Sequence, residues 1–66
     1  MSNRLREIRE AKGFNQRELA EKTHTSQTTI SELELGKRKP WLKVARRLAR
    51  KLGVPVEELF PDDFEG

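Results

Sequence analysis

Polar side chains between residues 27 and 32 are the ones in this chain best suited to hydrogen-bonding chemistry: Gln27, Thr28, Ser31 and Glu32. An amide donates and accepts, a hydroxyl does either, and a carboxylate only accepts. The edges of DNA bases carry donors and acceptors that these groups can match. A cationic tract, Lys37-Arg38-Lys39, follows closely and can bind phosphates. Together these features predict a surface that recognises duplex DNA.

Two short helices joined by a tight turn are predicted between residues 15 and 36, where they would hold these side chains. Asn15 can cap the first helix, and Glu18 three residues later can complete a capping box. This helix is expected to stop near Thr23. Ser26 can cap the second helix, which we expect to end near Leu35.

The rest of the chain is predicted to form three more helices around one core. They span about Ser2 to Lys12 (helix 1), Pro40 to Leu52 (helix 4), and a short turn from Val56 to Phe60 (helix 5). The two helices between residues 15 and 36 are thus helices 2 and 3. On the Pro40–Leu52 helix, the residues expected to face the core are Leu42, Ala45, Leu48, Ala49 and Leu52. The predicted fold is all-α, a compact five-helix domain over residues 1–61. An acidic tail, residues 62–66, is expected to be frayed.

The composition excludes several classes of protein. The 66 residues suffice for one small domain, and the absence of cysteine excludes disulfides and thiolate metal sites. With a single histidine, we expect no metal, no cofactor and no small-molecule ligand. Carboxylates are paired only where a surface position is expected, and neither a Ser-His-Asp set with a buried acid nor a phosphate-binding glycine loop is found, so an enzyme is not expected. No apolar run suggests a membrane span or a signal peptide, and we expect a cytoplasmic protein with no membrane partner.

Charge is distributed unevenly along the chain. Residues 36–53 hold eight Lys or Arg and no acid, whereas residues 54–66 hold five acids and no base. This separation favours a surface that faces a polyanion, with the acidic end held away from it. A helix face that is simply solvated is the alternative that charge alone leaves open.

Several motifs lie along the chain: Gln-x-x-Leu-Ala at 16–20, Ile-Ser-x-Leu-Glu-x-Gly-Lys-Arg at 30–38, Pro40, and Leu-Gly-Val with Glu-Glu-Leu-Phe at 52–60. Together they resemble the phage repressor and Cro type (XRE-like) of helix-turn-helix regulator. The similarity covers about residues 3–60 and implies a lambda-repressor-like fold with helices 2 and 3 as the helix-turn-helix. The chain departs from the family pattern at His24, where the turn usually has glycine, and at Trp41, where a small capping residue is usual.

The resemblance also implies roles for structural residues. Ala20 would stand at the closest approach of helices 2 and 3, and His24 in the turn between them. Ile30 and Leu33 would anchor helix 3, which leaves positions 27, 28, 31 and 32 on its outer side at 3.6 residues per turn. Arg9 and Glu34 would form a salt bridge that ties helix 1 to the end of helix 3. Trp41 is expected to pack on the core or to serve in self-association.

DNA contacts divide into two groups in this interpretation. Base contacts are predicted for Gln27 and Thr28 at the N-terminus of helix 3, together with Ser31 and Glu32. Phosphate contacts are predicted for Gln16, Ser26, Lys37, Arg38, Lys39 and Lys43. Simple solvated polar residues are the alternative for each group.

The sequence thus predicts a sequence-specific, double-stranded DNA-binding transcriptional regulator, in particular a repressor. We expect a homodimer, weak in the absence of DNA, that uses helices 4 and 5 and the tail, with candidates Trp41, Leu35, Phe60 and Phe64. The alternative is an antitoxin-like or accessory protein whose main partner is another protein. Two features support this alternative: the acidic tail and an exposed Phe64.

Overall fold

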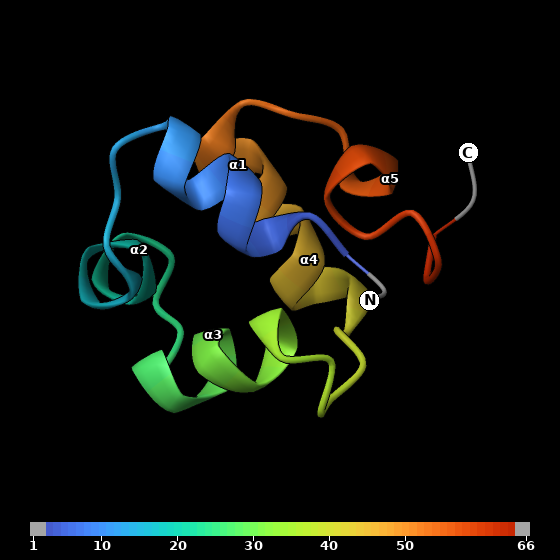
Figure 1. The fold of residues 1–66 in the computed structure, drawn as a ribbon, viewed down its shortest axis with the longest axis horizontal. Coiled ribbons are helices and arrows are strands. Elements are labelled where there is room, and N and C mark those ends of the chain that lie inside the picture. Colours follow the sequence, from blue (N-terminus) through green and yellow to red (C-terminus); the bar gives the residue numbers. More distant parts are fainter. Residues whose placement is uncertain (1–2, 65–66) are drawn as a thin grey trace.

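Five α-helices form the regular structure of residues 3–64, the part of the chain that the computed structural model describes. They are α1 (Leu5–Ala11), α2 (Gln16–Lys22), α3 (Gln27–Glu34), α4 (Leu42–Leu52) and α5 (Val56–Leu59). In Figure 1, α1 lies in the upper part of the molecule, while α3 runs along its lower edge. The all-α, five-helix prediction is confirmed. No helix within residues 3–64 is both long and apolar enough to cross a membrane.

The starts of α1 and α4 differ from the predicted ones. The α1 helix begins at Leu5, whereas Ser2, its predicted start, lies outside the described residues. The α4 helix begins at Leu42, because Trp41 before it is extended, with a ψ of 146°. Pro40 therefore belongs to the loop before α4.

The start of α2 follows the capping-box prediction. Oδ1 of Asn15 accepts a hydrogen bond from the Glu18 amide at 2.7 Å, and the Glu18 carboxylate accepts one from the Asn15 amide at 2.9 Å. Both bonds satisfy amides that a helix start would otherwise leave unpaired. The half-buried Phe14, just before this cap, packs against the core.

The turn between α2 and α3 is centred on His24, which adopts a φ of 55° in the left-handed region. The chain turns here, and the Thr25 amide donates to the Ala20 carbonyl at 2.9 Å. Thr23 is buried just before the turn, and its hydroxyl donates to the Leu19 carbonyl at 2.7 Å. The small Ala20 side chain is buried as well. These contacts fix the angle between the two helices.

All five helices contribute to one core. Its buried residues are Leu5, Ile8, Leu19, Ala20, Ile30, Leu33, Val44, Ala45, Leu48, Ala49, Leu52, Leu59 and Phe60. One predicted core residue of α4 is wrong: Leu42 is 47% exposed, and Val44 is buried in its place. Leu42 opens the helix, so it lies at the edge of the core, where the neighbouring elements no longer cover it.

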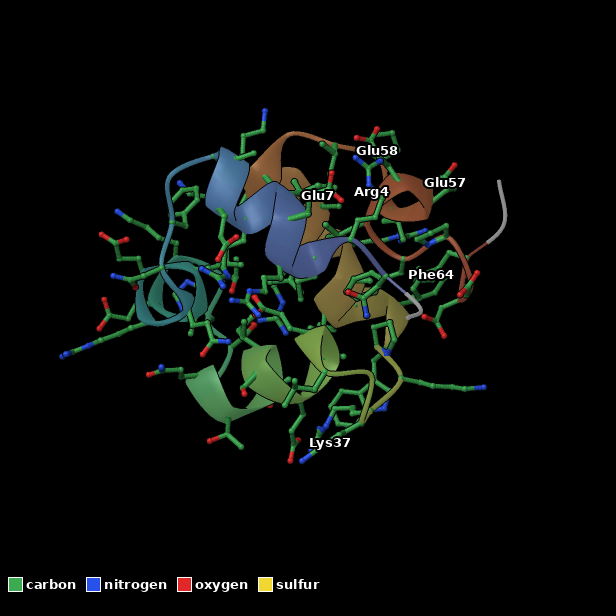
Figure 2. All side chains as sticks on the ribbon, in the orientation of Figure 1. Arg4, Glu7, Lys37, Glu57, Glu58 and Phe64 are labelled. Carbon is green, nitrogen blue, oxygen red and sulfur yellow. The ribbon has the colours of Figure 1, made fainter. Side chains whose placement is uncertain are left out.

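The chain after α5 makes a turn that packs on the core. The amides of Asp63 and Phe64 donate to the Phe60 carbonyl at 3.1 and 3.0 Å. The Phe64 ring meets Phe60 edge to face, with 6.3 Å between the ring centroids, and is half buried (Figure 2). Phe64 is therefore not the exposed residue that we predicted. Glu65 and Gly66, the end of the predicted frayed tail, lie outside the described residues.

Candidate nucleic-acid interface

A shallow hollow on the outer side of α3 gathers the four predicted base-contacting residues. Gln27, Thr28, Ser31 and Glu32 line it together with Gln16, Leu35 and Lys37. On the opposite side of the helix, Ile30 and Leu33 are fully buried. We call this hollow the reading hollow. One face of α3 is therefore committed to the core, and the other presents hydrogen-bonding groups to solvent.

The cationic tract lies next to the reading hollow because the chain turns at Gly36, directly after α3. Gly36 has a φ of 73°, and the Lys37 amide donates to the Glu32 carbonyl at 2.9 Å. Lys37 consequently sits at the hollow, and Figure 2 shows it below α3, on the far side of the molecule from Arg4 and Glu7. Lys39 is exposed in the same loop. Lys43 is exposed in the first turn of α4.

Arg38 and Glu32 are paired with each other in the structure. Nε of Arg38 donates to Oε1 of Glu32 at 3.0 Å, and Nη2 of Arg38 lies 2.9 Å from the same oxygen. The guanidinium carbon also lies 6.0 Å from the centre of the Trp41 ring. This pair could not be predicted from the sequence, because its partners are six residues apart across a turn, where helical periodicity gives no guidance.

Trp41 lies on the surface. Its side chain is 70% exposed, so the predicted packing on the core is wrong. Self-association, the other role expected of this residue, stays a prediction.

Ser26 and Gln16 are both engaged within the protein. The Ser26 hydroxyl accepts from the Thr29 amide at 3.0 Å, which makes Ser26 the cap of α3 as predicted. The Gln16 amide nitrogen donates to Oε1 of Glu34 at 2.9 Å. Gln16 also lines the reading hollow, so one residue connects that hollow with the interior.

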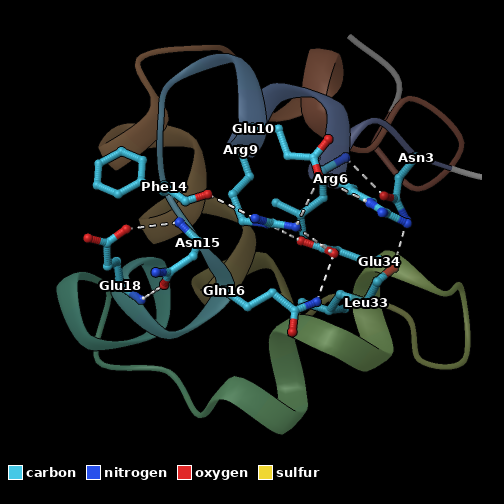
Figure 3. Close-up of polar contacts among 11 residues, drawn as sticks. Asn3, Arg6, Arg9, Glu10, Phe14, Asn15, Gln16, Glu18, Leu33 and Glu34 are labelled. Atoms are coloured by element: carbon cyan, nitrogen blue, oxygen red, sulfur yellow. Dashed lines mark hydrogen bonds and ion pairs between the residues drawn. The ribbon is translucent and has the colours of Figure 1, made fainter.

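Arg9 and Glu34 form the ion pair that the family resemblance implies, at the junction of α1, α2 and α3 (Figure 3). Nε of Arg9 lies 2.6 Å from Oε2 of Glu34, and Nη1 of Arg9 donates to the Phe14 carbonyl at 2.8 Å. The side chains are 8% and 4% exposed. Asn3 adds a bond from its side chain to the Leu33 carbonyl at 2.8 Å. The end of α3 is therefore fastened by groups from α1, α2 and the segment before α1.

Comparison with known proteins agrees with this geometry. The model of a family described as "Helix-turn-helix" matches residues 5–59. The chain belongs to the helix-turn-helix family. An uncharacterized helix-turn-helix-type transcriptional regulator of Archaeoglobus fulgidus is 42% identical over 65 residues, which cover 98% of this chain and 93% of the relative. The transcriptional repressor RstR of the cryptic phage CTXphi, from Vibrio cholerae, is 33% identical over 61 residues, which cover 92% of this chain and 55% of the repressor.

A solved structure is similar to this chain over most of its length. It is the restriction-modification controller protein C.AhdI from Aeromonas hydrophila, with a TM-score of 0.80 and 37% identity over 86% of each chain. The predictions of an XRE-like helix-turn-helix fold and of a DNA-binding transcriptional regulator are confirmed by these matches. The family is one of regulators and not of enzymes.

Proposed function

We propose that this helix-turn-helix regulator binds an operator in double-stranded DNA and represses transcription by occupying it. The observation that carries the proposal is the reading hollow, where the outward groups of α3 lie beside Lys37 while the other face of the helix is buried. A helix with this division can enter the major groove without disturbing the core. Since its target is DNA, we expect the protein to act in the cytoplasm.

Base recognition in this proposal begins at the N-terminus of α3. Gln27 and Thr28 are exposed there, and a glutamine amide can bond to N6 and N7 of adenine. The threonine methyl group can contact a thymine methyl group. Ser31 and Glu32 lie one turn further along the same hollow. These four side chains would therefore carry the sequence preference.

Phosphate contacts would set the position of the helix on the duplex. Lys37, Lys39 and Lys43 are exposed, and none has an ion pair within residues 3–64. Gln16, Ser26 and Arg38 were predicted for the same role. Each of them already has a partner inside the protein, so a phosphate contact would compete with that partner.

Two copies of the chain would bind a palindromic site, with half-sites about one helical turn apart. Of the four residues predicted for self-association, Phe60 is fully buried and Phe64 packs on it. Exposed apolar side chains remain available at Leu35 and Trp41, and Leu42 joins them. No small-molecule ligand is needed for this mode of action.

The test is a selection of bound sequences from random duplex DNA, followed by two variants. Gln27→Ala should relax the base preference and leave nonspecific binding nearly intact. Lys37→Ala should weaken binding to every sequence and lower the salt slope by about one phosphate contact. If wild-type protein shows no duplex binding at low salt, the proposal is wrong.

A main partner that is another protein is the competing function. One of the two features that supported it was an exposed Phe64, but that ring packs against Phe60. The acidic residues near the C-terminus are the supporting feature that remains. Salt-dependent duplex binding would decide between the two functions.

A further inference from the structure

The Arg38 side chain lies at the edge of the reading hollow and is held there by Glu32 and Trp41. Glu32 accepts from its Nε at 3.0 Å and lies 2.9 Å from its Nη2, through one carboxylate oxygen. The Trp41 ring lies 6.0 Å from the guanidinium carbon, within the range of a cation–π contact. Glu32 belongs to the hollow, whereas Arg38 and Trp41 line the depression next to it. The assembly therefore joins the recognition helix to the cationic loop.

Stability does not account for this assembly. The Arg38 and Glu32 side chains are 41% and 36% exposed, and exposed ion pairs contribute little to folding. Trp41 remains largely in solvent as well. We therefore explain the fixed geometry of these exposed side chains by a contact that they make with the bound DNA.

The ion pair leaves the donors of Arg38 in a particular arrangement. A guanidinium has five N–H groups, and Glu32 takes the edge formed by Nε and Nη2. The outer edge, formed by Nη1 and the second hydrogen of Nη2, keeps two parallel donors. That spacing matches O6 and N7 of guanine.

The charge of the pair argues against a simple phosphate contact. Glu32 neutralises Arg38 and would repel a phosphate brought close to both. Lys37 and Lys39 flank Arg38, lack such a partner within residues 3–64, and can bind phosphates without this cost. A neutral pair retains the direction of its hydrogen bonds, and direction is what base recognition needs.

We propose that Arg38 determines specificity by reading a guanine in the operator, and that Glu32 is the residue that positions it. The inference rests on the proposed DNA-binding function and changes the role expected of both residues. Glu32 then acts on specificity through Arg38, and no direct contact between Glu32 and a base is required. Because the pair is neutral, it contributes little to the salt dependence of binding.

Three variants test the proposal, each measured for base preference by selection from random duplex DNA and for salt slope on random duplex. Arg38→Lys keeps the charge and removes the two-donor edge. Glu32→Gln keeps the shape and removes the charge that holds Arg38. Glu7→Gln is the matched control, since Glu7 pairs with Arg4 at 3.2 Å on the far side of the molecule (Figure 2). The hydrogen bond and then the charge of Arg4 lower the pKa of Glu7, so this variant also removes one full charge at neutral pH.

The expected results separate the roles. Arg38→Lys should lose one guanine from the selected site, with a preference lowered about tenfold or more, and should keep the wild-type salt slope. Glu32→Gln should weaken the same guanine preference. It should also bind random duplex more tightly, with a slope steeper by about 0.9, because Arg38 is freed to bind a phosphate. Glu7→Gln should retain both the preference and the wild-type slope.

Two outcomes would overturn the inference. One is an Arg38→Lys variant that selects the wild-type site unchanged. The other is a Glu32→Gln variant that behaves like Glu7→Gln. In either case the proposed function would still hold, provided that the wild-type protein selects a site and that Gln27→Ala changes the selected bases. Absence of any selected site for wild type would instead contradict the proposed function itself.

Discussion

Glu34 has partners on more elements than its position in the sequence suggests. Its carboxylate receives Arg9 from α1 and Gln16 from α2, while Glu34 itself belongs to α3. The family resemblance implied the Arg9 contact. The Gln16 contact could not be predicted, because it depends on how α2 and α3 are oriented and not on any local spacing. At the scale of residues, the sequence therefore identified the structurally important side chains, but it identified only some of the partners that they bind.

Arg9→Ala should lower the free energy of unfolding by about 3 kcal/mol, since removing one partner of a buried pair leaves the other charge uncompensated. Glu34 is 4% exposed and would keep Gln16 as its remaining donor. Thermal or urea unfolding measures the change. The double variant Arg9→Ala with Glu34→Gln should recover part of the loss, because the uncompensated charge is gone. Equal stability of wild type and Arg9→Ala would contradict a structural role for the pair.

At the scale of elements, local signals decided most of the fold. The Asn15–Glu18 capping box set the start of α2, and glycines with positive φ follow α1, α3 and α4 at residues 13, 36 and 53. Leu42 shows the limit of such signals. The apolar stripe of α4 can be extended by residue 42 or by residue 44, and only the packing of neighbouring helices decides between them.

The His24 turn provides a test at this scale. Its φ of 55° is one that glycine adopts without strain. His24→Gly should therefore stabilise the fold, by less than about 1 kcal/mol because glycine also gains freedom in the unfolded chain. His24→Val should destabilise it by about 1–3 kcal/mol, since a β-branched residue strongly disfavours this φ. Melting temperatures should thus rank glycine, histidine and valine in descending order. A valine variant as stable as wild type would contradict strain at the turn.

The dimensions of the whole molecule limit what one copy can contact. The fold extends 27 × 23 × 20 Å, whereas half-sites one helical turn apart are separated by about 34 Å. On the proposed palindromic operator, one chain would therefore read one half-site, and two copies would be needed. The sequence predicted a self-association surface that included Phe60 and Phe64. Both rings instead pack within one copy, because their burial emerges only once the tail has folded onto the core.

Leu42→Lys should weaken self-association and binding to a two-half-site duplex, while binding to a single half-site stays near the wild-type level. A charge placed on a half-exposed apolar position opposes burial between copies and leaves the core intact. Sedimentation with and without DNA measures both effects. Ala11→Lys, at an exposed position near the end of α1, is the control for the added charge. Identical behaviour of the two variants would place the interface between copies elsewhere.

The division of α3 has an evolutionary consequence. Gln27 and Thr28 are exposed, so the hydrophobic core places no demand on either of them. Substitutions at these two positions can alter which promoters a lineage controls while the protein keeps its thermal tolerance. Paralogues that arise by duplication could diverge in their targets within a few mutational steps. The same independence makes this small scaffold a convenient one for engineering new genetic switches.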